Sequence, residues 1–231
     1  MHLEMVDSTL RMESKADSNL FQSLRERLFT AVVGDILDRE GYWHQFLPQP
    51  IKPLNPAHRV IGRAFPVRIA DVSGPQGRPF GKLTEALDAI QPGEVYLATG
   101  GSMNCAAWGE ILTVTARMRG GSGAVIDGFH RDTPRVLEQD WPVFSRGSFS
   151  QDAGVRSSVV DFRCAVEIGG VTIEPGDLVF GDIDGVLVIP RAIEQRALEL
   201  AMDKVAGEKS VRREIESGSN STDVFNRYGI L

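Results

Sequence analysis

The stretch from Glu94 to Phe144 reads EVYLATGGSMNCAAWGEILTVTARMRGGSGAVIDGFHRDTPRVLEQDWPVF and decides the fold class. Three apolar segments typical of buried strands lie at 94–98, 124–126 and 142–144. Between the first two, the helical spacing of Ala107, Ile111, Val114 and Met118 predicts a helix. Thr133-Pro134, an N-cap residue followed by proline, predicts a shorter one. This βαβαβ order indicates an α/β protein with parallel strands and right-handed crossovers.

The sequence before this stretch predicts helices, an extended connector and a strand. Phe21, Leu24, Leu28 and Val32 have helical spacing, and residues 30–41 form a second short helical pattern closed by Gly41. Four prolines exclude a regular helix over 42–58 and favour an extended connector. Alternation over 65–69 predicts a half-buried strand, and residues 73–82 are typical of a loop.

After the central stretch the period of the pattern changes. Strict alternation over 160–168 predicts one strand, and Gly169-Gly170 predicts a hairpin into 171–173. Two further turns lead into apolar segments at 178–180 and 186–189, which indicates an antiparallel β module. Residues 190–215 predict a long amphipathic helix weakened only at Gly207, and residues 217–222 have the composition of a linker.

Length and pattern together favour one domain. The chain has 231 residues, for which one to two domains are expected, and the antiparallel module is too small to stand apart. We therefore predict a flexible N-terminal segment over 1–19, a single mixed domain over 20–215 and a C-terminal tail over 216–231.

Composition excludes several function classes. The chain is 42% hydrophobic and 24% charged, with a net charge of −6, which is typical of an ordinary globular protein. It has no run of basic residues that would track phosphates, so we expect no nucleic-acid partner. It has neither a stretch of about 20 apolar residues nor a hydrophobic signal core at the N-terminus. We expect a cytoplasmic protein with no membrane partner.

The two cysteines give no metal or redox motif. Cys105 and Cys164 share no CxxC spacing and have no neighbouring histidine. Each lies in an apolar pattern, so buried thiols in a reducing compartment are favoured over a disulfide or a nucleophile.

Candidate chemistry lies in two loops that follow predicted parallel strands, because ligands of open α/β sheets bind beyond the carboxyl ends of the strands. Residues 99–110 offer free backbone N–H groups at a helix start, which suits an anion. Arg131 beside Asp132 offers a carboxylate-binding guanidinium and a hard oxygen ligand for a cation. This describes a pocket for a small anionic oxo acid beside a metal.

Structural alternatives exist for each of these residues. Gly100-Gly101 can be a simple tight turn, and Arg131–Asp132 can be an ordinary surface ion pair. His130 is a candidate base, but a histidine next to a strand end is more often a satisfied structural residue, which we favour.

The run from Gly109 to Asp132 resembles the family of class II 4-hydroxy-4-methyl-2-oxoglutarate aldolases and the related RraA-type regulators of ribonuclease activity. That family's motif is an acid, twenty residues and then Arg-Asp, which here is Glu110 followed by Arg131-Asp132. Further stretches that resemble the family, in its order, are 30–41, 142–147, 169–171 and 175–190.

The resemblance implies a β/β/α phosphohistidine-domain-like (swivelling) fold, with a mixed sheet and flanking helices, that assembles as a homotrimer or a dimer of trimers. It implies that the helix start formed by Gly109, Glu110, Ile111 and Leu112 receives the substrate's carboxylate. Arg131 matches the substrate-binding arginine, and Asp132 matches the residue that anchors Mg²⁺ or Mn²⁺. Arg135 departs from the family, which usually has an acid at that position.

The activity implied is divalent-metal-dependent cleavage of 4-hydroxy-4-methyl-2-oxoglutarate, or a similar 4-hydroxy-2-oxo acid, to pyruvate by retro-aldol chemistry. Oxaloacetate decarboxylation is an expected side activity, because both reactions pass through the enolate of pyruvate. Lys82 lies in a loop with no apolar pattern, which argues against a Schiff base.

Two other functions are weighed against this one. The alternative is a non-enzymatic, protein-binding regulator of a ribonuclease, which the retained Asp132 disfavours because such regulators tend to lack it. A methyltransferase is discounted, since no glycine-rich strand–helix loop with a following acid is present.

Overall fold

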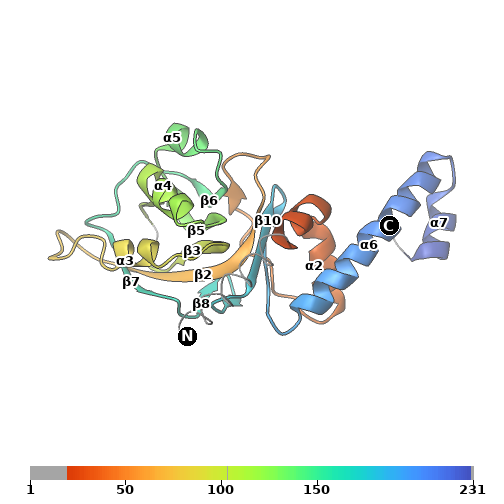
Figure 1. Cartoon of the computed structure of the whole chain (residues 1–231), viewed down its shortest axis with the longest axis horizontal. Coiled ribbons are helices and arrows are strands. Elements are labelled where there is room, and N and C mark those ends of the chain that lie inside the picture. Colours follow the sequence, from red (N-terminus) through yellow and green to blue (C-terminus); the bar gives the residue numbers. More distant parts are fainter. Residues whose placement is uncertain (1–19, 103, 230–231) are drawn as a thin grey trace, which may run out of the picture.

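The computed structural model describes residues 20–102 and 104–229 (Figure 1). Residues 20–27 are helical. The helices that follow are α2 (Thr30–Arg39), α3 (Leu83–Asp88), α4 (Glu110–Met118), α5 (Thr133–Leu137), α6 (Glu194–Glu216) and α7 (Ser221–Tyr228). The strands of the first half are β1 (Lys52–Pro53), β2 (Val60–Asp71), β3 (Glu94–Thr99), β4 (Ala106–Trp108) and β5 (Gly123–His130). Those of the second half are β6 (Val143–Ser148), β7 (Ser157–Phe162), β8 (Val166–Ile168), β9 (Val171–Ile173), β10 (Leu178–Asp182) and β11 (Gly185–Ile189).

In the described part of the chain, nine strands form one mixed sheet. Its main path is β1-β6-β5-β3-β2-β10-β11, and β4 and β7 pair with β5 and β2. The strands β2, β3, β5 and β6 are parallel neighbours, while β1, β7, β10 and β11 pair antiparallel. The prediction of an α/β fold with a mixed sheet and flanking helices is confirmed, as is the parallel order of the central βαβαβ unit.

Apolar side chains cover both faces of this sheet. On one face, α3 and α4 pack over an aromatic row in which Phe65, Tyr96 and Trp108 lie with ring centroids 4.9–6.1 Å apart. Residues 20–27, α2 and α6 pack together over β10 and β11. The β8–β9 hairpin contributes to a third cluster with residues of the central strands. Burial on this scale is the main stabilising term of the fold.

The predicted strand over 160–168 is wrong as one element. The chain turns at Arg163, whose φ of 54° lies in the left-handed region. Consequently β7 stays with β2, and β8 pairs only with β9. The turn is held by the Arg163 side chain, which donates to Glu94 at 2.7 and 3.0 Å and lies over the ring of Phe65.

The predicted helix through Phe21, Leu24, Leu28 and Val32 is interrupted at residues 28–29. All four side chains are buried, as their apolar spacing predicts. The break follows from a distant residue, because the buried Asp182 carboxylate accepts the backbone N–H and the hydroxyl of Thr30 at 2.8 and 2.7 Å. It thereby caps α2 at its first residue.

The helix predicted after Ala107 exists, but its orientation differs from the expectation. Ala107 lies in β4, and α4 begins at Glu110. Thr113 and Ala116 face the core, whereas Ile111 and Met118 are 69% and 74% exposed and Val114 is also exposed. The apolar face that identified this helix therefore points away from the core of the chain.

The C-terminal helices extend beyond the sheet, and α7 runs back beside the end of α6 (Figure 1). The long predicted helix is confirmed as α6, which continues through Gly207. Of residues 217–222, expected to be a linker, only 217–220 connect the two helices, because α7 begins at Ser221. Arg227 of α7 pairs with Glu214 of α6 at 2.7 Å.

Three remaining expectations concern the termini, the thiols and the membrane. The predicted flexible segment 1–19 lies outside the described residues. Cys105 and Cys164 are free thiols, the first buried and the second half-buried. Within residues 20–102 and 104–229, the structure contains no helix long and apolar enough to cross a membrane.

Candidate active site

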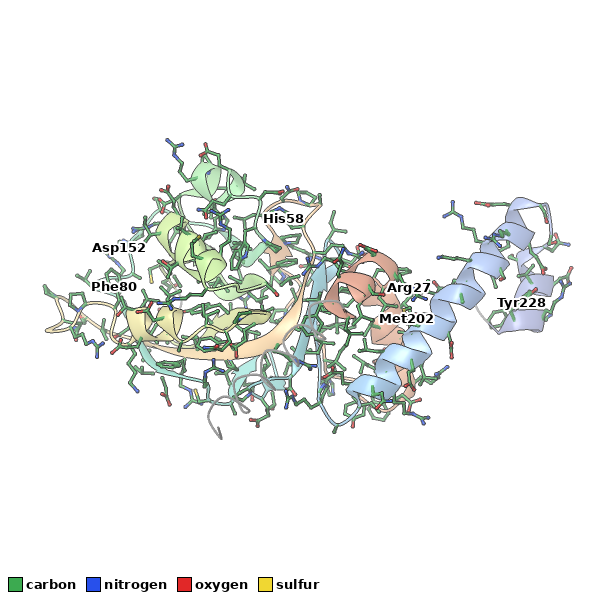
Figure 2. The ribbon with its side chains drawn as sticks, viewed as in Figure 1. Arg27, His58, Phe80, Asp152, Met202 and Tyr228 are labelled. Atoms are coloured by element: carbon green, nitrogen blue, oxygen red, sulfur yellow. The ribbon has the colours of Figure 1, made fainter. Side chains whose placement is uncertain are left out.

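A cavity of about 140 Å³ lies where β5 ends and α4 begins. Residues from four separate segments line it, among them Phe80, Trp108, Glu110, Arg131, Asp132 and Asp152. Phe80 and Asp152 lie at the end of the molecule opposite α6 and α7 (Figure 2). The cavity is thus at the carboxyl ends of the parallel strands, where a binding site is expected in such a sheet.

The backbone fixes Arg131 and Asp132 at this cavity. The N–H of Arg131 donates to the carbonyl of Trp108 at 2.9 Å, which continues the pairing of β4 with β5. Asp132 has a φ of 57° and its carbonyl accepts the N–H groups of Arg135 and Val136, so it turns the chain from β5 into α5. Aspartate tolerates this left-handed conformation better than most residues.

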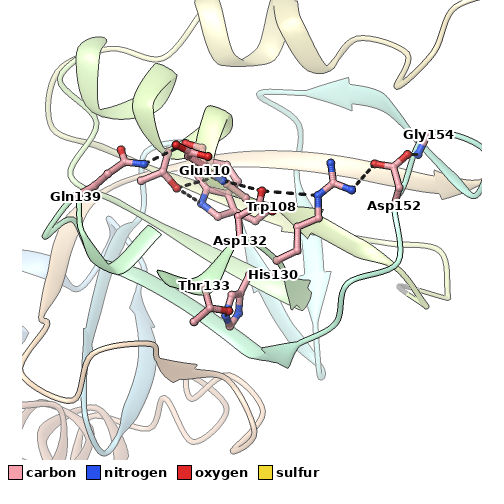
Figure 3. A network of polar contacts seen from close by, with 11 residues as sticks. Trp108, Glu110, His130, Asp132, Thr133, Gln139, Asp152 and Gly154 are labelled. Carbon is pink, nitrogen blue, oxygen red and sulfur yellow. Dashed lines mark hydrogen bonds and ion pairs between the residues drawn. The ribbon is translucent and has the colours of Figure 1, made fainter. Parts of the chain in front are cut away.

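The start of α4 lies against the Asp132 carboxylate (Figure 3). The N–H of Glu110 donates to Oδ2 of Asp132 at 3.3 Å, and a Cβ added at Gly109 would lie 2.7 Å from the same oxygen. The N–H groups of Ile111 and Leu112 belong to the first turn, where no intrahelical acceptor exists. With the helix dipole, they favour an anion beside Asp132.

The Arg131 side chain lies between two carboxylates (Figure 3). Its Nε is 3.8 Å from Oδ2 of Asp132, and its Nη1 is 2.8 Å from Oδ1 of Asp152. Asp152 comes from the β6–β7 loop and was missed by the sequence analysis. That loop has neither periodicity nor a motif, so no local signal indicated that Asp152 would reach Arg131.

His130 has the surroundings of a structural residue. It is 4% exposed, and its Nδ1 and Nε2 lie 2.8 and 2.9 Å from the hydroxyls of Ser145 and Thr133. Burial lowers the pKa of His130 from its usual value, so the neutral ring is favoured. The ring is not among the residues that line the cavity, and its two hydrogen bonds fasten the turn that carries Arg131 and Asp132.

Arg135 also lies outside the cavity wall. Its Nη1 contacts both carboxylate oxygens of Glu138 at 2.9 and 3.2 Å, and both side chains are exposed. The hydrogen bond and charge of Glu138, with the charge of Glu110, raise the pKa of Arg135. Arg135 therefore belongs to a surface ion pair with Glu138.

The Gly100-Gly101 segment is a tight turn. Both glycines have positive φ, at 117° and 62°, and a Cβ at either would lie within 2.6 Å of Ile69 or Asp71. The N–H of Ser102 donates to the carboxylate of Asp71 at 2.9 Å. The structural alternative considered for Gly100 and Gly101 is therefore confirmed, and between residues 99 and 110 the helix start lies at Gly109–Glu110.

The residues fit a loosely held divalent cation. Three carboxylates (Glu110, Asp132, Asp152) and one guanidinium line the cavity, which leaves an excess of negative charge. Over the described residues, no group of three or more His, Cys, Asp or Glu side chains converges on a point that would hold a metal. This donor set suits Mg²⁺, which often keeps several waters and uses one or two protein carboxylates. Asp132 is the residue that would hold it.

Comparisons with known proteins identify the family of this chain. A family described as RraA-like (Aldolase/RraA) matches residues 30–188. The chain is 34% identical to a protein of Halalkalibacterium halodurans named "Putative 4-hydroxy-4-methyl-2-oxoglutarate aldolase", covering 80% of this chain and 84% of that one. It is 31% identical to Protein DlpA of Legionella pneumophila over 94% of this chain, but spans only 35% of that protein.

A solved structure shares the fold. The crystal structure of RraAS2 from Streptomyces coelicolor, described as an unusual member of the RNase ES inhibitor RraA protein family, superposes with a TM-score of 0.75. The two sequences are 29% identical, and the match covers 85% of this chain and 98% of that one.

Proposed function

Because this chain belongs to the RraA-like (Aldolase/RraA) family, we propose that it is a divalent-metal-dependent lyase that cleaves a 4-hydroxy-2-oxo acid to pyruvate. 4-Hydroxy-4-methyl-2-oxoglutarate is the candidate substrate, after the names of its relatives. The observation that carries the proposal is the meeting of Arg131, Asp132 and the first turn of α4 at one cavity. The cavity thus combines a guanidinium that can bind a carboxylate, a carboxylate that can bind a cation, and backbone N–H donors of the first helical turn.

The proposed reaction is a retro-aldol cleavage. The bond between C3 and C4 breaks and its electron pair stays on C3, which gives the enolate of pyruvate. The 4-hydroxyl loses its proton and C4 becomes a carbonyl, and C3 is then protonated. Negative charge therefore develops on the 2-oxo oxygen, and catalysis depends on stabilising it.

In this proposal Arg131 binds the carboxylate of the 2-oxo acid and stabilises the enolate. Its guanidinium offers several donors in one plane, which match the two oxygens of a carboxylate. The N–H groups at the start of α4 orient the same carboxylate. Asp132 holds the divalent cation, Mg²⁺ or Mn²⁺, which when bound supplies Lewis-acid stabilisation of the substrate's oxygens.

The same groups support decarboxylation of oxaloacetate as a side activity, because loss of CO₂ also leaves the pyruvate enolate. A Schiff-base route is not favoured. The described residues that line the cavity include no lysine, and Lys82 pairs with Asp161 at 3.3 Å.

The direct test is pyruvate release from a panel of 4-hydroxy-2-oxo acids and oxaloacetate, with Mg²⁺, with Mn²⁺ and with EDTA. We expect activity that requires the cation and is lost in Asp132→Ala. Asp88→Ala is a matched control, because Asp88 is an exposed acid that pairs with Arg119 on the surface. Full activity in EDTA or in Asp132→Ala would overturn the lyase proposal.

The second candidate is a non-enzymatic regulator that docks on a ribonuclease. One observation favours it, namely the description of the Streptomyces coelicolor relative as a member of an RNase ES inhibitor family. Inhibition of RNA cleavage by an RNase ES-type enzyme at stoichiometric concentration, together with no pyruvate release under any condition, would select this function.

A further inference from the structure

Asp152 is the part of the cavity that neither the motif nor the proposed reaction uses. Its Oδ1 lies 2.8 Å from Nη1 of Arg131, whereas Asp132 lies nearest to Nε of the same guanidinium. Arg131 and Asp152 side chains are 39% and 44% exposed, so a small solute can reach both. The guanidinium that would bind a substrate's carboxylate is therefore already paired with a carboxylate of the chain itself.

The backbone around Asp152 holds this carboxylate in place. The N–H of Ala106 donates to the carbonyl of Gln151 at 2.8 Å, and Arg156 donates to the carbonyl of Asp152 at 3.0 Å. The second carboxylate oxygen, Oδ2, accepts the N–H of Gly154 at 2.8 Å. Any side chain at position 154 would clash with it, since a Cβ there would lie 2.8 Å from Oδ2.

The two carboxylate oxygens of Asp152 have different partners. Oδ2 accepts the N–H of Gly154, and the shortest contact with Arg131 is through Oδ1. A free carboxylate can instead take two parallel N–H bonds from a guanidinium, which is the stronger arrangement. A ligand carboxylate that forms two such bonds can therefore replace Asp152 on Arg131, at the cost of one exposed ion pair.

We propose that Asp152 is an internal competitor, which occupies in the free protein the position on Arg131 that the carboxylate of a 2-oxo acid takes when it binds. This inference rests on the proposed function, since it assumes that Arg131 is the substrate's anion partner. Asp152 is then a positioning residue that sets the affinity for small carboxylates. It also adds negative charge to the cavity, which disfavours an anion that arrives without a cation.

The test uses Asp152→Asn and oxalate, a planar dianion with the same pair of adjacent oxygens as the pyruvate enolate. The amide oxygen of asparagine can still accept the N–H of Gly154, so the NH₂ group would face Arg131 and cannot accept from it. We expect oxalate to bind about two- to fivefold more tightly by calorimetry without added metal, the range for an exposed ion pair. The KM for a 2-oxo acid substrate should fall, with little change in kcat.

Asp88→Asn is the matched control. It removes one negative charge and one exposed ion pair, with Arg119, away from the cavity, so oxalate affinity should stay at the parent value. Unchanged or weaker binding in Asp152→Asn would overturn the competition, because Asp152 would then be neutral or would help to orient Arg131.

Arg131→Ala separates this inference from the proposed function. If Arg131→Ala abolishes oxalate binding while Asp152→Asn leaves the affinity unchanged, only the competition fails. If Arg131→Ala binds oxalate as the parent does, Arg131 is not the anion partner and both proposals fail. If neither the parent nor Asp152→Asn binds oxalate, only the competition fails, because the proposed lyase binds its substrate together with a cation. Circular dichroism of each variant establishes that a loss of binding is not a loss of fold.

Discussion

Gly109 and Asp132 fit together so closely that no other residue type can occupy position 109 without moving the carboxylate. A Cβ at 109 would lie 2.7 Å from Oδ2 of Asp132 and 3.4 Å from Cγ of Arg131. The backbone at Gly109 is extended, with a φ of −172°, so the restriction comes from this contact and not from backbone strain. The backbone at the start of α4 thus lies directly against Oδ2 of Asp132, the residue that follows the end of β5 by two positions.

Gly109→Ala should therefore displace Asp132 while the fold is retained. We expect kcat/KM for pyruvate release to fall about 10- to 100-fold, the scale on which misplacement by an ångström acts. Gly77→Ala is the control, since a Cβ there meets nothing within 4 Å. Parent-like activity in Gly109→Ala would show that the position of Asp132 does not matter for turnover.

Arg131→Lys should impair both binding and turnover. Lysine keeps the charge but loses the planar fork that pairs with a carboxylate through two bonds. We expect a loss of about 1.5–3 kcal/mol in kcat/KM, the range for a hydrogen bond to a charged group. Arg119→Lys, at a surface pair with Asp88, should leave the kinetics unchanged. Unchanged kinetics in Arg131→Lys would show that this arginine does not meet the substrate.

Arg135 should influence substrate choice and not the chemistry. Its positive charge near the cavity favours substrates with a second, distal carboxylate, and its pairing with Glu138 mutes that effect. Arg135→Glu should lower the ratio of kcat/KM for a dicarboxylic over a monocarboxylic 4-hydroxy-2-oxo acid. Glu138→Gln, which frees Arg135, should raise it. If neither variant moves the ratio, Arg135 is a surface residue without a role in selectivity.

The exposed face of α4 should be covered in a closed homo-oligomer, and threefold symmetry is what the family resemblance implies. Contiguous apolar side chains on the surface of a soluble protein commonly mark an interface. Light scattering at micromolar concentration should give three or six times the 25.3 kDa chain mass, and Met118→Lys should reduce it. Val160→Lys, at an exposed position of β7, should keep the parent mass. A parent mass near that of one chain would contradict the prediction.

His130 should make the fold less stable in mild acid. Burial lowers its pKa below the ordinary value of 6.5, so the unfolded chain takes up the proton more readily than the folded one. The free energy of unfolding therefore decreases as the pH falls through about 6.5, and this contribution levels off below the folded-state pKa. Urea unfolding at pH 7.5 and 5.5 should show a smaller difference for His130→Gln than for the parent. An equal difference would mean that another group causes the dependence.

Several features followed from the sequence alone. Runs of buried strand residues alternate with helical patterns between 94 and 144, and such local periodicity reports burial wherever the partner lies. Arg131 and Asp132 are neighbours in the chain at the end of a strand, so their shared location needed no tertiary information. The acid separated from them by twenty residues carries the resemblance to the family, which the comparisons confirm.

Only the tertiary structure decided which atoms meet. An apolar pattern shows that a face is covered but not by what, so the sequence did not reveal that Ile111 and Met118 of α4 point away from the core. Asp182 ends one helix and caps the next from a position 152 residues away, and Asp152 reaches Arg131 from a loop without periodicity. Such contacts are set by the packing of the whole sheet, because a polar side chain carries no local signal of its distant partner.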